Sequence, residues 1–329
     1  MSDHPSAEFG MRSEELEGLV AGALEQAREQ GADQAEAGAA LGTGLAVTVR
    51  RGDVETLEYQ RDRAFTITVY FDQRKGSAST SDLSPSAIAE GVKKACSIAR
   101  YTAQDACAGL ADAQLMATDI PELELDHPWS LTPDEAIQLA TRCESAGLDF
   151  DERISNSEGG SINTARRARV YGNSHGFVGS YASSSHSLSC VLVAGAEDGM
   201  ERDFWYSSSR DPAALMSPEA VGKMAAERTL RRLGGRKIET CSAPVIFPAE
   251  LARGLLASFV SAITGTAQYR RASFLLDAVG DNVFPNGFRI EEKPHLPAGP
   301  ASAPFDNEGV ATHDRVLVDD GRLQGLVLS

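Results

Sequence analysis

The longest strand-rich block of this chain covers residues 154–207 and reads ISNSEGGSINTARRARVYGNSHGFVGSYASSSHSLSCVLVAGAEDGMERDFWYS. Turn-forming residues divide the block at Gly159-Gly160, Gly172–Gly176 and Asp198-Gly199. Apolar residues also alternate earlier, over 45–49 and 65–71, with a hairpin signal at Gly52-Asp53 between them. Runs of strands interrupted by separate helices predict an α+β fold with antiparallel sheets and flanking helices, rather than a wound parallel sheet.

Four helices have recognisable start signals in the sequence. The expected first residues or caps are Ser13, Ser84-Pro85, Thr132-Pro133 and Ser217-Pro218. The third of these signals continues with Asp134-Glu135, which completes a capping box.

The elements suggest three parts. Residues 1–12 are expected to form a disordered tail, because they are polar and lack any apolar period. Residues 13–235 form an N-terminal and central α+β region, with a surface connection at about 103–130. Residues 236–329 begin a β-rich C-terminal domain that looks truncated, because a hairpin around Asp320-Gly321 would end inside its second strand, 323–328.

The composition limits the class of protein. A net charge of −16 and a pI near 4.8 argue against broad nucleic-acid binding. The basic clusters, at Arg166–Arg169, Arg231–Lys237 and Arg270-Arg271, are expected on solvated faces or in local ion pairs. No apolar run is long enough to predict a membrane span. The five cysteines are scattered and form no C-x-x-C pair, which favours reduced thiols and a cytoplasmic location.

One predicted helix lacks ionisable side chains over most of its length. The segment 244–274, PVIFPAELARGLLASFVSAITGTAQYRRASF, predicts a helix after Pro248 that is buried on most sides, with Leu255 and Phe259 in the core. From Gly254 to Ala267 it contains no Asp, Glu, His, Cys, Lys or Arg. A zinc peptidase helix needs two imidazoles and a carboxylate, and this helix supplies none of them.

Several segments resemble the TldD/PmbA family, most closely its PmbA (TldE) branch. They are GSASTSDLSPSAIAEGV, RISNSEGGS, YGNSHGF, GMERDFWY, PVIFPAELARGLL, GTAQYRRASFLLD and PFDNEGVAT, spread from about Glu14 to Ser329. In the TldD branch the corresponding helix carries His-Glu-x-x-x-His and binds zinc. The resemblance places the three functional positions of that motif on Ala257, Ser258 and Ala262. It also implies that members extend further at the C-terminus.

The resemblance implies a metal-free subunit that pairs with a zinc-bearing TldD-like paralogue and acts on unfolded or precursor peptides. No cofactor is expected in this chain, and zinc is expected in the partner. An alternative is a stand-alone regulatory protein, the "DNA gyrase modulator" of the family's older label, which would act through protein contacts. An independent hydrolase that uses Ser174 is a third hypothesis.

Two further groups could carry chemistry. Gly172–Gly176 matches Gly-x-Ser-x-Gly, but strand-like residues on both sides favour a tight turn over a nucleophile elbow around Ser174. His175, His186 and Cys190 could share a metal, although a strand would hold His186 and Cys190 too far apart for joint ligation. We therefore expect His186 to be a half-buried strand residue.

Charged residues near the ends of two predicted elements leave alternatives open. Glu201 and Asp203 share one face of a strand, with Arg202 on the other face, and could serve as an acid–base pair or as partners of nearby cations. Tyr269, Arg270 and Arg271 follow the helix without ionisable residues. They could bind a peptide carboxylate or simply cap a helix end.

Overall fold

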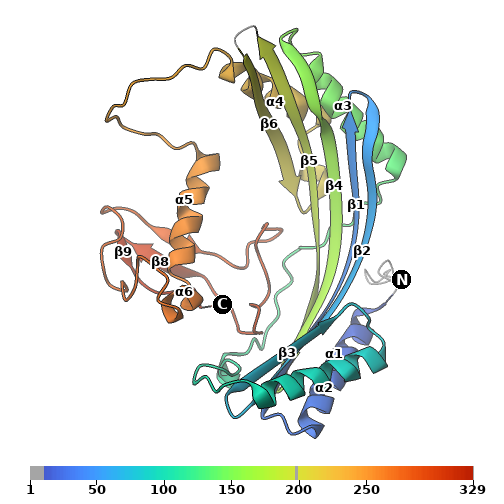
Figure 1. Ribbon diagram of the computed structural model, residues 1–329, viewed down its shortest axis with the longest axis vertical. Coiled ribbons are helices and arrows are strands. Elements are labelled where there is room, and N and C mark those ends of the chain that lie inside the picture. The colour runs from blue at the N-terminus through green and yellow to red at the C-terminus, as the bar shows by residue number, and fades with distance from the viewer. Residues whose placement is uncertain (1–10, 197–198, 329) are drawn as a thin grey trace.

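In the computed structural model, which describes residues 11–196 and 199–328, the chain is built around a long, curved antiparallel sheet (Figure 1). The sheet has six strands in the order β3-β2-β1-β4-β5-β6. The strands are β1 Gln34–Arg50, β2 Asp53–Phe71, β3 Arg74–Thr80, β4 Ile154–Asn173, β5 Val178–Ala196 and β6 Gly199–Ser209. The predicted α+β class is confirmed. Asp198 of one expected turn and residues 1–10 of the expected tail lie outside the described residues.

Helices form where the sequence predicts them. They are α1 Ser13–Glu29, α2 Pro85–Tyr101, α3 Pro133–Leu148, α4 Pro218–Arg232, α5 Ala249–Ala262 and α6 Gly265–Tyr269, with 3-10 turns at Ala113–Leu115 and Pro212–Ala214. The Thr132 hydroxyl accepts the Glu135 amide at 3.3 Å, and the Glu135 carboxylate accepts the Thr132 amide at 2.9 Å, which confirms the capping box. Helix α1 is capped one residue earlier than expected, at Arg12, whose amide donates to Glu15.

The two faces of the sheet differ along its whole length. In β1 the odd-numbered residues from Ala35 to Leu41 pack with α1 and α2, and those from Leu45 to Val49 pack with α3 and α4. Because alternate residues of a strand share a face, both helix pairs cover the same side of the sheet, which we call the helix face. The even-numbered residues of β1 and their neighbours line the opposite side, the open face.

Two separate apolar cores lie on the helix face, one at each end of the sheet. The first contains Leu16, Val20, Phe65, Ile67 and Val92, and the second contains Val47, Ile162, Leu192, Val221 and Ala140. Close backbone contacts shape the second core. A Cβ at Gly222 would lie 2.0 Å from the Cys143 carbonyl oxygen, so α3 and α4 cross where glycine allows it.

The strands are longer than the sequence pattern indicates. Gly42–Gly44 has no apolar alternation, yet β1 continues through it because it pairs with Gln60–Asp62 on one side and Ala165–Arg167 on the other. Gly159-Gly160 is not a turn, which corrects the sequence prediction. Gly159, with φ 116°, instead lies at an irregularity inside β4, where the pairing with β5 shifts.

The C-terminal part forms a smaller unit with its own core. Its sheet has the order β7-β8-β9, with β7 Ile290–Glu292, β8 Arg315–Asp319 and β9 Arg322–Leu323. The predicted turn at Asp320-Gly321 is confirmed, with φ of 48° and 81°. The expected second strand over 323–328 is wrong beyond Leu323. The backbone of Val327 bonds instead to Ile263 and Gly265 at the end of α5.

A strap, residues 302–311, joins this unit to the open face. The ring of Phe305 is buried and makes edge contacts with Phe177 at 5.2 Å and Tyr181 at 5.6 Å between ring centres. Gly179 lies beneath it, where a Cβ would come within 2.7 Å of the Phe305 ring. The strap therefore occupies a hollow that exists because β5 has a glycine there.

No helix of the described residues is long and apolar enough to cross a membrane.

Candidate functional site

The three positions of the family zinc motif lie on α5. Ala257 and Ser258 are exposed, Ala262 is buried, and the Ser258 hydroxyl donates to the Gly254 carbonyl at 3.0 Å within the same helix. Two methyl groups and a hydroxyl already bonded to its own backbone form no donor set for zinc. These residues do not fit the metal. Within the described ranges, no group of three or more His, Cys, Asp or Glu is arranged to hold a metal ion.

The burial predicted for α5 is wrong for most of the helix. Phe259 is 5% exposed and is confirmed as a core residue, whereas Leu255 is 54% exposed. Leu251 and Leu256 are exposed as well. An apolar repeat cannot show which of its sides other elements cover, and no described element packs over this side of α5.

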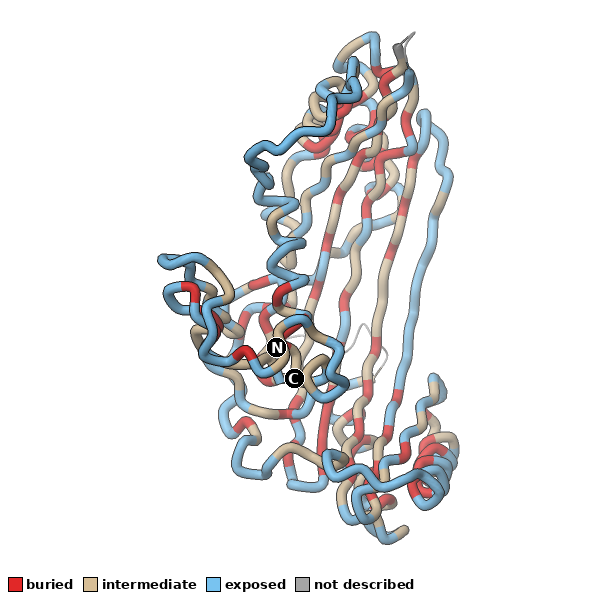
Figure 2. Tube along the Cα trace, turned by 60° about the vertical axis from the view of Figure 1, so that its left-hand side comes forward, coloured by how far each residue is buried: buried red, intermediate tan, exposed pale blue. Residues whose placement is uncertain are grey.

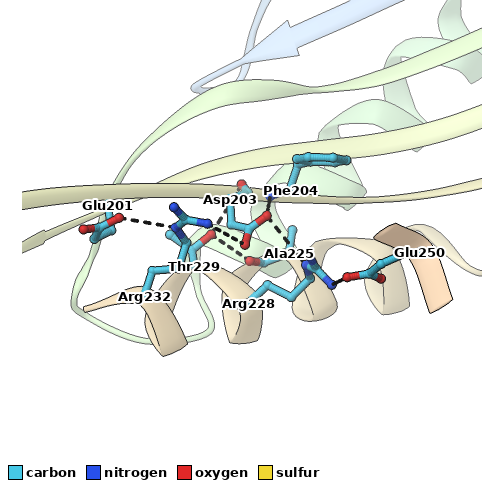
Figure 3. Close-up of polar contacts among 8 residues, drawn as sticks. All are labelled: Glu201, Asp203, Phe204, Ala225, Arg228, Thr229, Arg232 and Glu250. Carbon is cyan, nitrogen blue, oxygen red and sulfur yellow. Dashed lines mark hydrogen bonds and ion pairs between the residues drawn. The ribbon is translucent and has the colours of Figure 1, made fainter. Parts of the chain in front are cut away.

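The first turn of α5 is tied to α4 through a charged network (Figure 3). Arg228 of α4 donates to the Glu250 carboxylate at 2.8 Å and lies 3.6 Å from the Asp203 carboxylate of β6. Its guanidinium also stacks over Trp205 at 5.0 Å from the ring centre. The residues between the two helices, 235–248, are exposed throughout, so this contact fixes where α5 begins.

The carboxylates of β6 are paired with cations, which decides between the two readings of Glu201 and Asp203. Arg232 lies 3.3 Å from the Glu201 carboxylate and 3.7 Å from that of Asp203. Arg202 points to the other face, as predicted, and pairs with Glu158 at 2.6 Å. The pair therefore joins β6 to α4 rather than forming a free acid–base couple.

Ser174 and His175 lie in the turn between β4 and β5. The Ser174 hydroxyl accepts the Ala35 amide at 3.0 Å, and His175 Nε2 donates to the Ala111 carbonyl at 3.1 Å. Strands precede and follow this turn, which confirms the expected context and differs from the strand–turn–helix of a nucleophile elbow. Neither side chain has the geometry of a nucleophile with its base.

His186 is more buried than expected, at 1% exposure, and its ring is bonded on both sides. Its Nε2 donates to the His127 carbonyl at 2.9 Å, so Nδ1 accepts from the Thr164 hydroxyl at 2.8 Å. Burial lowers the pKa of His186, which favours the neutral ring. Cys190 is buried in the second core, and His175 is exposed on the turn, so the three residues do not form a shared site.

The aromatic and basic residues after α5 lie on the surface. The Tyr269 hydroxyl donates to the Asp105 carboxylate at 2.9 Å. The amide of Cys107, and then this hydroxyl, lower the pKa of Asp105, and the bond to Asp105 raises the pKa of Tyr269. Arg270 ends α6, and Arg271 has φ 52°. Both guanidinium groups are exposed and form no ion pair with any described residue, so they are available to an anionic group.

The open face holds a polar hollow of about 280 Å³ beside the strap. In it the Glu36 carboxylate accepts from the hydroxyls of Tyr70 at 3.1 Å and Tyr171 at 2.9 Å. Burial, and then the charge of Glu36, raise the pKa of both tyrosines. Arg169 donates to Asn307 of the strap at 3.0 Å. Sequence analysis missed this cluster, although a Glu among alternating alanines was a visible signal.

Comparison with known proteins gives one consistent result. Family models match domain 1 of PmbA/TldA metallopeptidases over residues 35–99, the central domain over 126–233 and the C-terminal domain over 240–329. Metalloprotease PmbA of Escherichia coli O157:H7 is 49% identical over 314 residues, which is 95% of this chain and 70% of the relative. A Metalloprotease PmbA homolog of Haemophilus influenzae is 45% identical over 98% of this chain and 71% of the relative.

Solved structures of similar proteins have the same fold. A candidate modulator of DNA gyrase from Bacteroides thetaiotaomicron has a TM-score of 0.89 and 28% identity, over 96% of this chain and 72% of that one. TldE from Thermococcus kodakarensis, at 16% identity, shares the fold with a TM-score of 0.71 over 94% and 70% of the two chains. The chain belongs to the PmbA/TldD metallopeptidase family.

Proposed function

We propose that this chain is the metal-free subunit of a two-subunit TldD/PmbA-type zinc peptidase that acts on unfolded or precursor peptides in the cytoplasm. The observation that carries the proposal is the chemistry of α5. Its three motif positions, Ala257, Ser258 and Ala262, offer no zinc ligand and no general base. Zinc and the hydrolytic step belong to a TldD-like partner, where the metal would activate water.

The open face suits a role in holding substrate. Its middle carries small or polar side chains, among them Gly42, Gly44, Ala165, Ser185 and Ser187. A wall of this kind leaves room for an extended peptide and imposes little sequence preference. Main-chain hydrogen bonds to strand edges would then provide most of the affinity and tolerate many sequences. Arg270 and Arg271 are the residues we assign to binding a substrate carboxylate.

The decisive experiment is co-expression with a paralogue from the same genome that carries His-Glu-x-x-x-His. We expect the two chains to co-purify with one zinc per pair, and the pair to cleave unfolded casein in a chelator-sensitive way. This chain alone should contain no stoichiometric zinc and should not cleave. Stoichiometric zinc in the isolated chain, or cleavage by it that Ser174→Ala abolishes, would overturn the proposal.

The role of the two arginines is tested within the same complex. Replacing Arg270 and Arg271 by alanine should raise KM for peptides while kcat changes little, because the substitution removes a binding contact and no reacting group. Arg253→Ala, an exposed arginine on α5, is the matched control. If Arg253→Ala raised KM as much, Arg270 and Arg271 would not be the residues that bind the substrate carboxylate.

A second candidate function rests on the solved relatives that are named as modulators of DNA gyrase. A chain with a net charge of −16 would act there through protein contacts rather than through DNA. Co-purification distinguishes the two functions, since a modulator would bind gyrase and need no zinc-bearing paralogue.

A further inference from the structure

One border of the large sheet is open. β3 pairs with β2 only from Phe65 to Phe71, so the outer side of residues 53–64 has no strand beside it among the described residues. Figure 2 shows this exposed border as a long pale-blue stretch. Unpaired strand edges form hydrogen bonds readily with another strand.

The opposite border of the sheet is β6, where side chains bond to part of the backbone. At β6 the Asp203 carboxylate accepts the amide of Phe204 at 2.8 Å, and the Asp203 carbonyl accepts the Thr229 hydroxyl of α4 at 3.4 Å (Figure 3). Side chains thus bond to two backbone groups of that edge, at Asp203 and Phe204. At β2 no such bond to the backbone of residues 56–64 is present among the described residues, so this whole stretch can accept a partner strand.

Apolar side chains lie along the open border. Leu57 and Tyr59 are on the helix face, paired with Val47 and Leu45, yet they are 43% and 65% exposed. Their partners Val47 and Leu45 in β1 are buried under α3 and α4, whereas Leu57 and Tyr59 lie outside the area that these helices cover. A strand added to β2 would place side chains beside them.

The charges along the border are arranged so that the edge is complementary to itself. Asp53, Glu55 and Glu58 precede Tyr59. Arg61 and Arg63 follow it, with Asp62 between them. In an antiparallel arrangement, the acidic half of one edge lies against the basic half of another identical edge. We propose that residues 53–64 of β2 pair with the same edge of a second copy of this chain, in antiparallel register about Tyr59.

The charges also disfavour neighbouring registers, although an axis at Leu57 would oppose like charges only at Arg63 and Arg51, beside the turn between β1 and β2. A two-fold axis through the sheet places residues of the same face opposite each other, so it must pass through one residue. An axis at Glu58 would put two glutamates opposite each other, one at Gln60 would put Glu58 opposite Asp62, and one at Arg61 would oppose two arginines. Like charges directly opposite destabilise a strand pair.

An axis at Tyr59 avoids these conflicts. The facing pairs are then Tyr59 with Tyr59, Glu58 with Gln60, Leu57 with Arg61, and Glu55 with Arg63. The two rings can stack at the axis, and each leucine lies along the aliphatic part of an arginine. This inference does not depend on the proposed peptidase role.

Disulfide cross-linking tests the register. In a chain with exposed Cys107 and Cys241 changed to serine, Tyr59→Cys places two thiols directly opposite, with Cα atoms about 4.5–5.5 Å apart, inside the disulfide range. Leu57→Cys is the control, because its two copies would lie about 13 Å apart along the strands. The double variant Leu57→Cys/Arg61→Cys should cross-link again.

Sedimentation of the whole chain provides the second measurement. We expect a concentration-dependent dimer that Tyr59→Lys converts to monomer without changing the circular dichroism spectrum. A monomer at all concentrations would overturn the proposal. So would Tyr59→Cys cross-linking no faster than Leu57→Cys, the result expected if copies associate through α5 or bind some other strand.

Discussion

The buried carboxylate of Glu144 holds the turn between β1 and β2. Glu144 of α3 is 1% exposed, and its oxygens accept the amides of Arg51 at 2.7 Å and Gly52 at 3.1 Å. Glu144→Ala removes both acceptors and leaves a cavity, so the free energy of unfolding should fall by about 2–4 kcal/mol in urea denaturation. Glu144→Gln keeps the volume and one acceptor, and should lose less. An unchanged urea midpoint for the alanine variant would contradict this account.

Protonation of His186 should make stability depend on pH. Because its pKa in the folded state lies below the ordinary value of about 6.5, the unfolded chain binds more protons as pH falls through that value. The stability that neutral His186 contributes is therefore present above pH 6.5 and declines below it. The stability difference between the wild type and His186→Gln should narrow from pH 7 to pH 5. Parallel urea midpoints across that range would contradict the prediction.

Single residues show where sequence reasoning stops. The alternation around Glu201 and Asp203 placed both on one strand face, and the structure confirms it. Their cationic partners Arg228 and Arg232 lie on a helix further along the chain, and no local pattern indicates that pairing. The same holds for Glu144, whose partner Gly52 is 92 residues away.

At the scale of elements, α5 allows a matched comparison within one helix. Phe259 packs against Phe284 with ring centres 5.0 Å apart, whereas Leu255 is mostly exposed. Phe259→Ala should cost about 3 kcal/mol of unfolding free energy. Leu255→Ala should change it by less than about 0.5 kcal/mol. Thermal melting of both variants measures the difference in stability. Equal losses of stability would show that the Leu255 side of α5 is covered.

Helix starts were predictable and strand lengths were not, for a physical reason. Ser84, Thr132 and Ser217 each accept an amide of the first turn, an interaction contained within four residues of sequence. The continuation of β1 through Gly42–Gly44 depends on hydrogen bonds to β2 and β4. Pairing with distant strands overrides weak local propensity.

At the scale of the whole molecule, the strap links the C-terminal unit to the sheet, and Gly179 tests that link. Gly179→Ala should push Phe305 out of its hollow and speed hydrogen exchange of residues 302–311, while the cores under α1 to α4 keep their protection. Gly18→Ala is the control, since a Cβ there meets no atom within 4 Å. Unchanged exchange in the strap would show that Phe305 does not hold the unit in place.

The alternation of β1 has a consequence for how such genes can vary in length. Leu41 and Leu45 belong to different cores and face the same side, because they are four positions apart in the strand. One inserted codon between them would turn Leu45, Val47 and Val49 toward the open face. Insertions or deletions in this stretch of the sheet should therefore accumulate in steps of two codons, or be accompanied by a bulge that restores the phase.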